Sequence, residues 1–119
     1  MERTGHVTRE VVLDAPRDEV WEAITRPERL AEWFGGEVDL DPVPRGRVEH
    51  RAPDGSRRTG PVVSVDPPLR LVIWWTDAGD RDAPAAGGTR VEFVLLARDG
   101  GTLLTVTESE APSPLAMAG

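Results

Sequence analysis

The sequence predicts an α+β domain in which one strand and two short helices are followed by six strands of an antiparallel sheet. Apolar β-type runs recur from residue 37 to residue 109, whereas helical spacing is confined to residues 16–34. The stretch at 60–75, GPVVSVDPPLRLVIWW, is expected to form two strands at the sheet centre. Its Asp-Pro-Pro segment marks the turn between them, because proline cannot donate to a central ladder.

The first strand and the first helix are predicted from a change in the spacing of apolar residues. Residues 7–14 alternate in polarity, with Val7, Val11 and Leu13 on one face. Pro16 suits the first turn of a helix, and the apolar stripe that follows at helical spacing is Val20, Ala23 and Ile24.

A second helix is predicted over about residues 26–33. Thr25 and Glu28 match the spacing of a capping box, in which each side chain accepts a backbone N–H. Leu30 would face inward, and Gly35 would end the helix because glycine enters the region of positive φ at little cost.

The remaining chain predicts a meander of strands separated by turn sequences. The turns carry proline, glycine and aspartate, and the stretch at 76–88 reads as a mobile loop. The predicted strands are 37–40, 45–52, 57–66, 69–75, 89–97 and 102–109.

Composition narrows the possible functions. The chain has 119 residues, the size of one domain, and its net charge of −7 argues against nucleic acid and anionic membranes as partners. No apolar run suits membrane insertion, and the N-terminus lacks the apolar core of a signal peptide, so a cytoplasmic location is expected. There is no cysteine, every basic residue is arginine, and histidine occurs twice. We therefore expect no metal site and no cofactor, and an enzyme here would rely on carboxylates, imidazoles and hydroxyls.

Four stretches together are similar to one family: VTREVVLDAPRDEVWEAITRPERLAEWF, GPVVSVDPPLRLVIWW, TRVEFVLLA and GGTLLTVTES. In order and spacing they resemble the bacterial AHSA1-like domains, which are related to the C-terminal half of the Hsp90 ATPase activator Aha1. These domains belong to the SRPBCC or helix-grip group, with START, Bet v 1 and polyketide-cyclase-like proteins. The resemblance covers residues 7–109. It implies a curved seven-stranded sheet around a long C-terminal helix, with an apolar cavity between them.

The end of the sequence departs from that pattern. Residues 110–119, EAPSPLAMAG, contain two prolines and are too few for a helix of several turns. We expect a disordered or truncated tail, which would leave the concave face of the sheet as an exposed apolar patch unless something else covers it. Such patches usually meet a partner, so the single domain at 1–119 is expected to form a homodimer through this face or to be poorly stable.

Strand parity places two polar candidates, His50 and Glu108, on the concave face. A desolvated imidazole–carboxylate pair could perform acid–base catalysis or hold the polar end of a ligand, whereas a pair at a wet rim would be structural. The remaining candidates follow from parity and from the resemblance. The predicted ligand-contacting residues are Trp33, Phe34, Val48, His50, Leu71, Ile73, Trp75, Phe93, Leu95, Leu104 and Val106.

Three functions are compatible with these observations. The first is binding of a small hydrophobic, aromatic or lipid-like molecule in an apolar pocket. The second is a polyketide cyclase, aromatase or hydratase that uses His50 and Glu108. The third is a co-chaperone-like domain that acts on an Hsp90 homologue, as the resemblance implies.

Overall fold

Seven strands form one antiparallel sheet in the order β1-β7-β6-β5-β4-β3-β2. The computed structural model describes residues 6–77 and 88–111, with the side chains of His6, Pro27, Trp33 and Asp77 excepted. The elements are β1 (His6–Leu13), α1 (Arg17–Thr25), α2 (Pro27–Phe34), β2 (Glu37–Leu40), β3 (Arg47–Arg51), β4 (Arg57–Asp66), β5 (Arg70–Asp77), β6 (Gly88–Arg98) and β7 (Gly101–Ala111). The predicted α+β class and its sequence of elements are confirmed.

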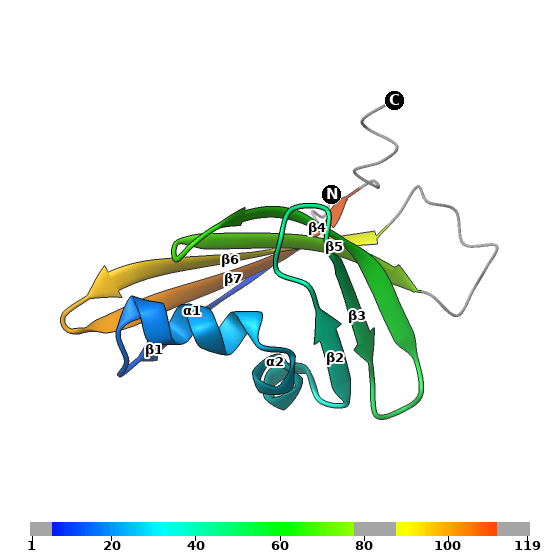
Figure 1. Ribbon diagram of the computed structural model, residues 1–119, viewed down its shortest axis with the longest axis horizontal. Helices are drawn as coiled ribbons and strands as arrows, with labels where there is room; N and C mark the ends of the chain where they lie inside the picture. Colours follow the sequence, from blue (N-terminus) through cyan, green and yellow to red (C-terminus); the bar gives the residue numbers. More distant parts are fainter. Residues whose placement is uncertain (1–5, 78–87, 112–119) are drawn as a thin grey trace.

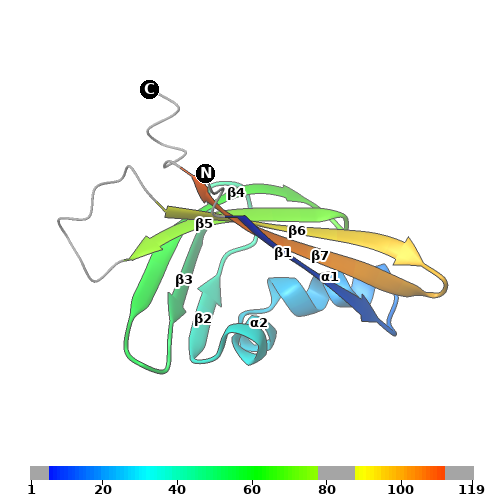
Figure 2. The same ribbon diagram turned by 180° about the vertical axis from the view of Figure 1, so that it is seen from behind.

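The sheet is strongly curved, and α1 and α2 both lie on its concave side (Figures 1 and 2). β5 is the fourth of the seven strands, so the stretch at 60–75 does supply the sheet centre. In the turn before it, the Leu69 N–H donates to the Asp66 carbonyl at 2.7 Å. A register shift between Val62 and Ser64 in β4 inserts an extra residue, which increases local bending.

β1 pairs with the last strand, β7, rather than with a neighbour in sequence. The register runs from His6 opposite Ser109 to Leu13 opposite Thr102. Directly opposed residues of an antiparallel pair project to the same face. The alternating side chains at Val11 and Leu13 therefore join the concave face beside β7.

The helices cover the apolar concave face. Val20, Ile24 and Leu30 are 2–3% exposed and belong to one cluster with the inward residues of the sheet. The strand residues of this cluster, which would be exposed if the concave face had no cover, are buried, at 0–3% of their accessible area. They are Val48, Leu71, Ile73, Trp75, Phe93, Leu95, Leu104 and Val106. Among the described residues, α1 and α2 provide this cover, which is the alternative to an open apolar patch that the sequence left open.

The predicted capping box is also wrong. Thr25 is the last residue of α1, and its hydroxyl donates to the Trp21 carbonyl at 2.8 Å. The N-cap of α2 is Arg26, which makes no side-chain capping bond. The hydroxyl bonds within its own helix instead, a local alternative that threonine often takes. Pro27 at the first position of α2 and Gly35 after its end agree with prediction; Gly35 has φ 77° and ψ 160°.

Three predicted segments lie partly or wholly outside the described residues. β7 continues through Ala111, so the first two residues of the predicted tail at 110–119 are strand, and residues 112–119 are not described. Most of the loop at 76–88 and the N-terminal residues 1–5 are likewise not described. Within the described residues, no helix is long and apolar enough to cross a membrane.

Candidate functional site

A groove of about 390 Å³ opens on the concave side, between β1, β7 and the end of α2. It is lined by Arg9, Val11, Leu13, Phe34 and Val106. Arg9 is directly opposite Val106, and Val11 is opposite Leu104, so β1 and β7 form one wall. Phe34, the last residue of α2, forms the facing wall.

The charge at the groove is an ion pair on this wall. The Arg9 guanidinium contacts the Glu108 carboxylate, and their side chains are 61% and 27% exposed. Solvent screens such a pair, which therefore contributes little to stability. Arg9 is two residues before Val11 on β1, and Glu108 is two residues after Val106 on β7. The groove therefore has a polar end at the ion pair and an apolar end at the valines.

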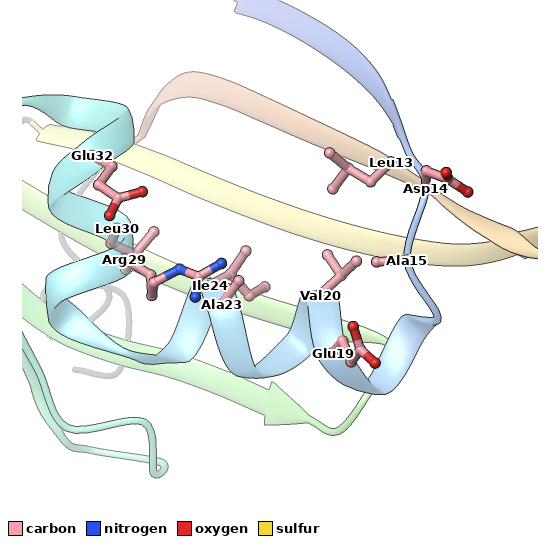
Figure 3. Close-up of a pocket in the computed structure, with 10 residues that line it drawn as sticks. All are labelled: Leu13, Asp14, Ala15, Glu19, Val20, Ala23, Ile24, Arg29, Leu30 and Glu32. Atoms are coloured by element: carbon pink, nitrogen blue, oxygen red, sulfur yellow. The ribbon is translucent and has the colours of Figure 1, made fainter.

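A second, smaller pocket of about 240 Å³ lies beside the groove, between α1, α2 and the end of β1 (Figure 3). Leu13 lines both hollows. The inner side chains of α1, Val20 and Ile24, form the apolar floor (Figure 3). The polar groups of its lining are Asp14, Glu19, Arg29 and Glu32. The concave side thus has two adjoining apolar hollows next to the edge strand.

The predicted pair of His50 and Glu108 is not formed. His50 is on β3 and Glu108 is on β7, and three strands lie between them in the sheet. Glu108 binds Arg9, whereas His50 has two other partners. Parity identified the shared face correctly but could not give the distance across it, since the strand order depends on non-local pairing.

His50 is 3% exposed, and both of its ring nitrogens are bonded. Nε2 lies 2.9 Å from the Gly35 carbonyl oxygen, and Nδ1 lies 3.0 Å from Nη2 of Arg58. A guanidinium can only donate, so Nδ1 accepts and the proton is on Nε2, which donates to Gly35. The ring therefore connects β3 to Arg58 on β4 and to Gly35, the residue that follows α2. Neither nitrogen is left to act on a substrate.

Of the residues predicted to contact a ligand, Phe34 and Val106 line the groove. The structure does not describe the Trp33 side chain. The remaining predicted residues are buried and do not line the groove. They are Val48, His50, Leu71, Ile73, Trp75, Phe93, Leu95 and Leu104, and all except His50 belong to the hydrophobic core.

Sequence reasoning missed the contribution of β1. Arg9, Val11 and Leu13 line the groove although none was a predicted site residue. Alternation had placed Val11 and Leu13 on one face, which was the available signal. The missing information was the pairing of β1 with β7, which joins residues almost a hundred positions apart.

Two groups with shifted pKa values lie away from the groove. The hydrogen bond to the Glu37 carboxylate raises the pKa of Arg51 on β3. The hydroxyl of Ser56, followed by its backbone N–H, lowers the pKa of Asp54 in the turn between β3 and β4. Both are exposed structural interactions that stabilise one end of the sheet.

Solved structures share this fold. CalU16 from Micromonospora echinospora is 32% identical, with a TM-score of 0.67, and the match covers 93% of this chain and 63% of that one. DynU16, a protein of the dynemicin biosynthetic locus, is 31% identical, with a TM-score of 0.75 over 94% of this chain and 39% of that one. The chain therefore spans less than two thirds of either protein.

A more distant structure, PFC0360w, an HSP90 activator from Plasmodium falciparum, has a TM-score of 0.69 at 16% identity, over 90% of this chain and 74% of that one. At that identity the likeness shows the fold alone. No curated protein matches the chain. The model of the family described as activator of Hsp90 ATPase homolog 1-like protein matches residues 14–118. Its match and the curved sheet with two helices agree with the resemblance noted in the sequence, and the chain belongs to this AHSA1 family.

Proposed function

We propose that the chain binds a small hydrophobic or aromatic molecule in the groove between β1, β7 and α2. The observation that carries this proposal is the groove itself: about 390 Å³, walled by Val11, Leu13, Phe34 and Val106, with Arg9 as the one charged residue among the described residues that line it. Ligand sites are usually hollows of about 300–1,000 Å³ that are largely apolar with a few polar groups. The groove is therefore large enough for a compound with two fused aromatic rings or a short acyl chain.

One relative is consistent with a small-molecule role, since DynU16, at 31% identity, is a protein of the dynemicin biosynthetic locus. Fold likeness alone does not establish function, so the proposal depends on the groove and not on the relative.

Adjacent valines of β1 provide a matched pair of variants to test the site. Val11 lines the groove, whereas Val12 projects to the other face of the sheet and is 70% exposed. Val11→Trp fills the groove, and Val12→Trp makes the same change of residue on the same strand but outside it. Titration with the neutral fluorescent probe N-phenyl-1-naphthylamine should give saturable binding to the wild type. We expect the affinity to fall at least tenfold in Val11→Trp and to stay within twofold in Val12→Trp.

Two results would contradict the proposal. One is the absence of saturable binding of this probe and of two-ring aromatic compounds to the wild type. The other is an equal loss in both variants, which would put the probe elsewhere. Far-ultraviolet circular dichroism of each variant checks that the sheet is retained.

The enzymatic alternative has less support. A cyclase or hydratase that uses His50 and Glu108 needs both groups at one substrate, and their bonds to Gly35, Arg58 and Arg9 hold them apart. Glu108 alone is near the groove. If Glu108→Gln abolished turnover of a bound polyketone while leaving its affinity intact, the enzymatic function would replace simple binding.

The co-chaperone alternative is supported by the family description. No surface of the described residues adds to it. Its test is the ATPase rate of a bacterial Hsp90 with and without this chain. Stimulation that survives Val11→Trp would assign a function independent of the groove.

A further inference from the structure

Four side chains form a cluster next to the groove: Phe34, His50, Arg58 and Trp75, of which His50 and Trp75 are buried and the other two are half-buried. The rings of His50 and Trp75 stack with centroids 5.7 Å apart and planes at 28°. The Arg58 guanidinium carbon lies 4.2 Å from the centre of the Trp75 ring, a cation–π contact. Trp75 is 1% exposed and His50 is 3% exposed, so the polar atoms of these two rings are shielded from water.

One polar atom of this cluster is not satisfied. His50 uses both ring nitrogens, with Gly35 and Arg58 as partners. Nε1 of Trp75 is buried and has no hydrogen-bond partner among the described residues. A buried indole N–H usually finds an acceptor, and leaving one unpaired costs free energy. Phenylalanine would fill an apolar site without that cost, so an indole here indicates an acceptor that the described residues do not supply.

Phe34 connects the cluster to the groove. Its ring lies 5.4 Å from the Trp75 ring, edge on, and 5.6 Å from the His50 ring, centroid to centroid. The same side chain lines the groove. It ends α2, immediately before the positive-φ residues Gly35 and Gly36. A molecule in the groove therefore contacts the ring that packs edge on against Trp75, so the groove and the indole are one side chain apart.

We infer that the ligand of the groove carries an oxygen acceptor, which receives the Nε1–H of Trp75 beside the Arg58 guanidinium. This inference depends on the proposed function and specifies the chemistry of its ligand. The indole supplies one donor at a fixed position. The positive charge over the same ring favours an electron-rich oxygen, as in an aryl ketone or an aryl carboxylate. A hydrocarbon of the same shape fills the groove but leaves the N–H unpaired.

Three ligands of matched shape test this: 2-ethylnaphthalene, 2-acetonaphthone and 2-naphthoate. Isothermal titration should give 2-acetonaphthone about 5- to 10-fold tighter binding than 2-ethylnaphthalene, the effect expected of one net hydrogen bond. In Trp75→Phe, which keeps the aromatic ring and removes the N–H, this preference should disappear. Trp21→Phe is the control, because it makes the same change of side chain at a partly buried tryptophan of α1 that does not line the groove. If the oxygen is anionic, 2-naphthoate binds tightest and loses that advantage in Arg58→Gln; if it is neutral, the ketone binds at least as tightly as the carboxylate.

A second readout uses the wild type and does not depend on the folding of Trp75→Phe. The indole N–H of Trp75, assigned through its nuclear Overhauser effects to Phe34, should move downfield with 2-acetonaphthone and much less with 2-ethylnaphthalene. Equal affinities for ketone and hydrocarbon, with an unmoved indole resonance, would overturn the inference while leaving the proposed binding function intact. Failure of all three compounds to bind would overturn both.

Discussion

His50 illustrates how one residue can look catalytic in a sequence and be structural in the fold. A polar side chain among apolar neighbours on β3 indicated either a functional residue or one whose hydrogen bonds are made within the fold. The bonds from its ring to Gly35 and Arg58 show that it is satisfied. Parity could predict which face it occupies, but its partners are set by α2 and β4, which no local pattern places.

We predict that His50→Ala destabilises the protein by about 2–4 kcal/mol. The substitution leaves a cavity and removes the partners of a buried carbonyl and a guanidinium. Glu108→Gln should cost less than about 1 kcal/mol, because its partner Arg9 is largely exposed. Urea denaturation measures both. Similar losses in the two variants would show that His50 is not the structural link described.

A second prediction at this scale concerns Asp54, whose pKa the Ser56 hydroxyl lowers most and the Ser56 backbone N–H lowers further. The carboxylate form is stabilised in the folded state, so this stabilisation is complete above the ordinary pKa of aspartate. It is lost as the pH falls through the lower, folded-state pKa. Ser56→Ala removes the larger cause and should move the pKa of Asp54 upward in a carbon-13 NMR titration. Ser64→Ala, far from this turn, should leave it unchanged. An unchanged pKa of Asp54 in Ser56→Ala would show that the Ser56 hydroxyl does not lower it.

Among the elements, β4 and β5 approach unusually closely at Gly60. A Cβ at this position would lie 1.8 Å from the Trp74 carbonyl oxygen and 2.8 Å from the Trp74 carbonyl carbon. Both are backbone atoms of the central strand, which cannot move without disturbing the sheet. The glycine that begins the stretch at 60–75 therefore has a packing role.

Gly60→Ala is expected to cost about 3 kcal/mol or more, since the methyl group has no space. Gly55→Ala is the comparison: φ there is 93°, but nothing lies within 4 Å of the added carbon. Its cost should be about 1 kcal/mol, from backbone strain alone. Thermal or urea unfolding gives both values. A Gly60→Ala variant as stable as Gly55→Ala would contradict the close approach.

Element boundaries were predictable because they depend on local chemistry. The strands at 37–40 and 57–66 begin and end where alternation and turn residues placed them.

The contacts of Trp74, in contrast to these boundaries, were not predictable. Trp74 is 5% exposed, and its Nε1 donates to the Ala111 carbonyl at 3.0 Å. That contact joins β5 to the end of β7, strands that do not pair in the sheet. Nothing local in the sequence indicates it.

On the scale of the whole molecule, the central question was what covers the concave face. Composition and parity predicted correctly that the face is apolar. They did not show that α1 and α2 bury it through Val20, Ile24 and Leu30, because the amount of cover depends on the curvature of the sheet and the position of the helices. For the same reason the site was only partly predicted. Phe34 and Val106 were expected, but the wall contributed by β1 was not.

Amide chemical-shift mapping with N-phenyl-1-naphthylamine locates the binding site residue by residue and so shows whether the groove beside β1 is occupied. We predict that the largest shifts fall on the residues that line the groove: Arg9, Val11, Leu13, Phe34 and Val106. Smaller shifts are expected on the convex face, where Leu96 is 50% exposed and is opposite Leu103 in β7. Shifts concentrated at Leu96 and its neighbours, or no shifts at saturating probe, would show that the groove is not the binding site.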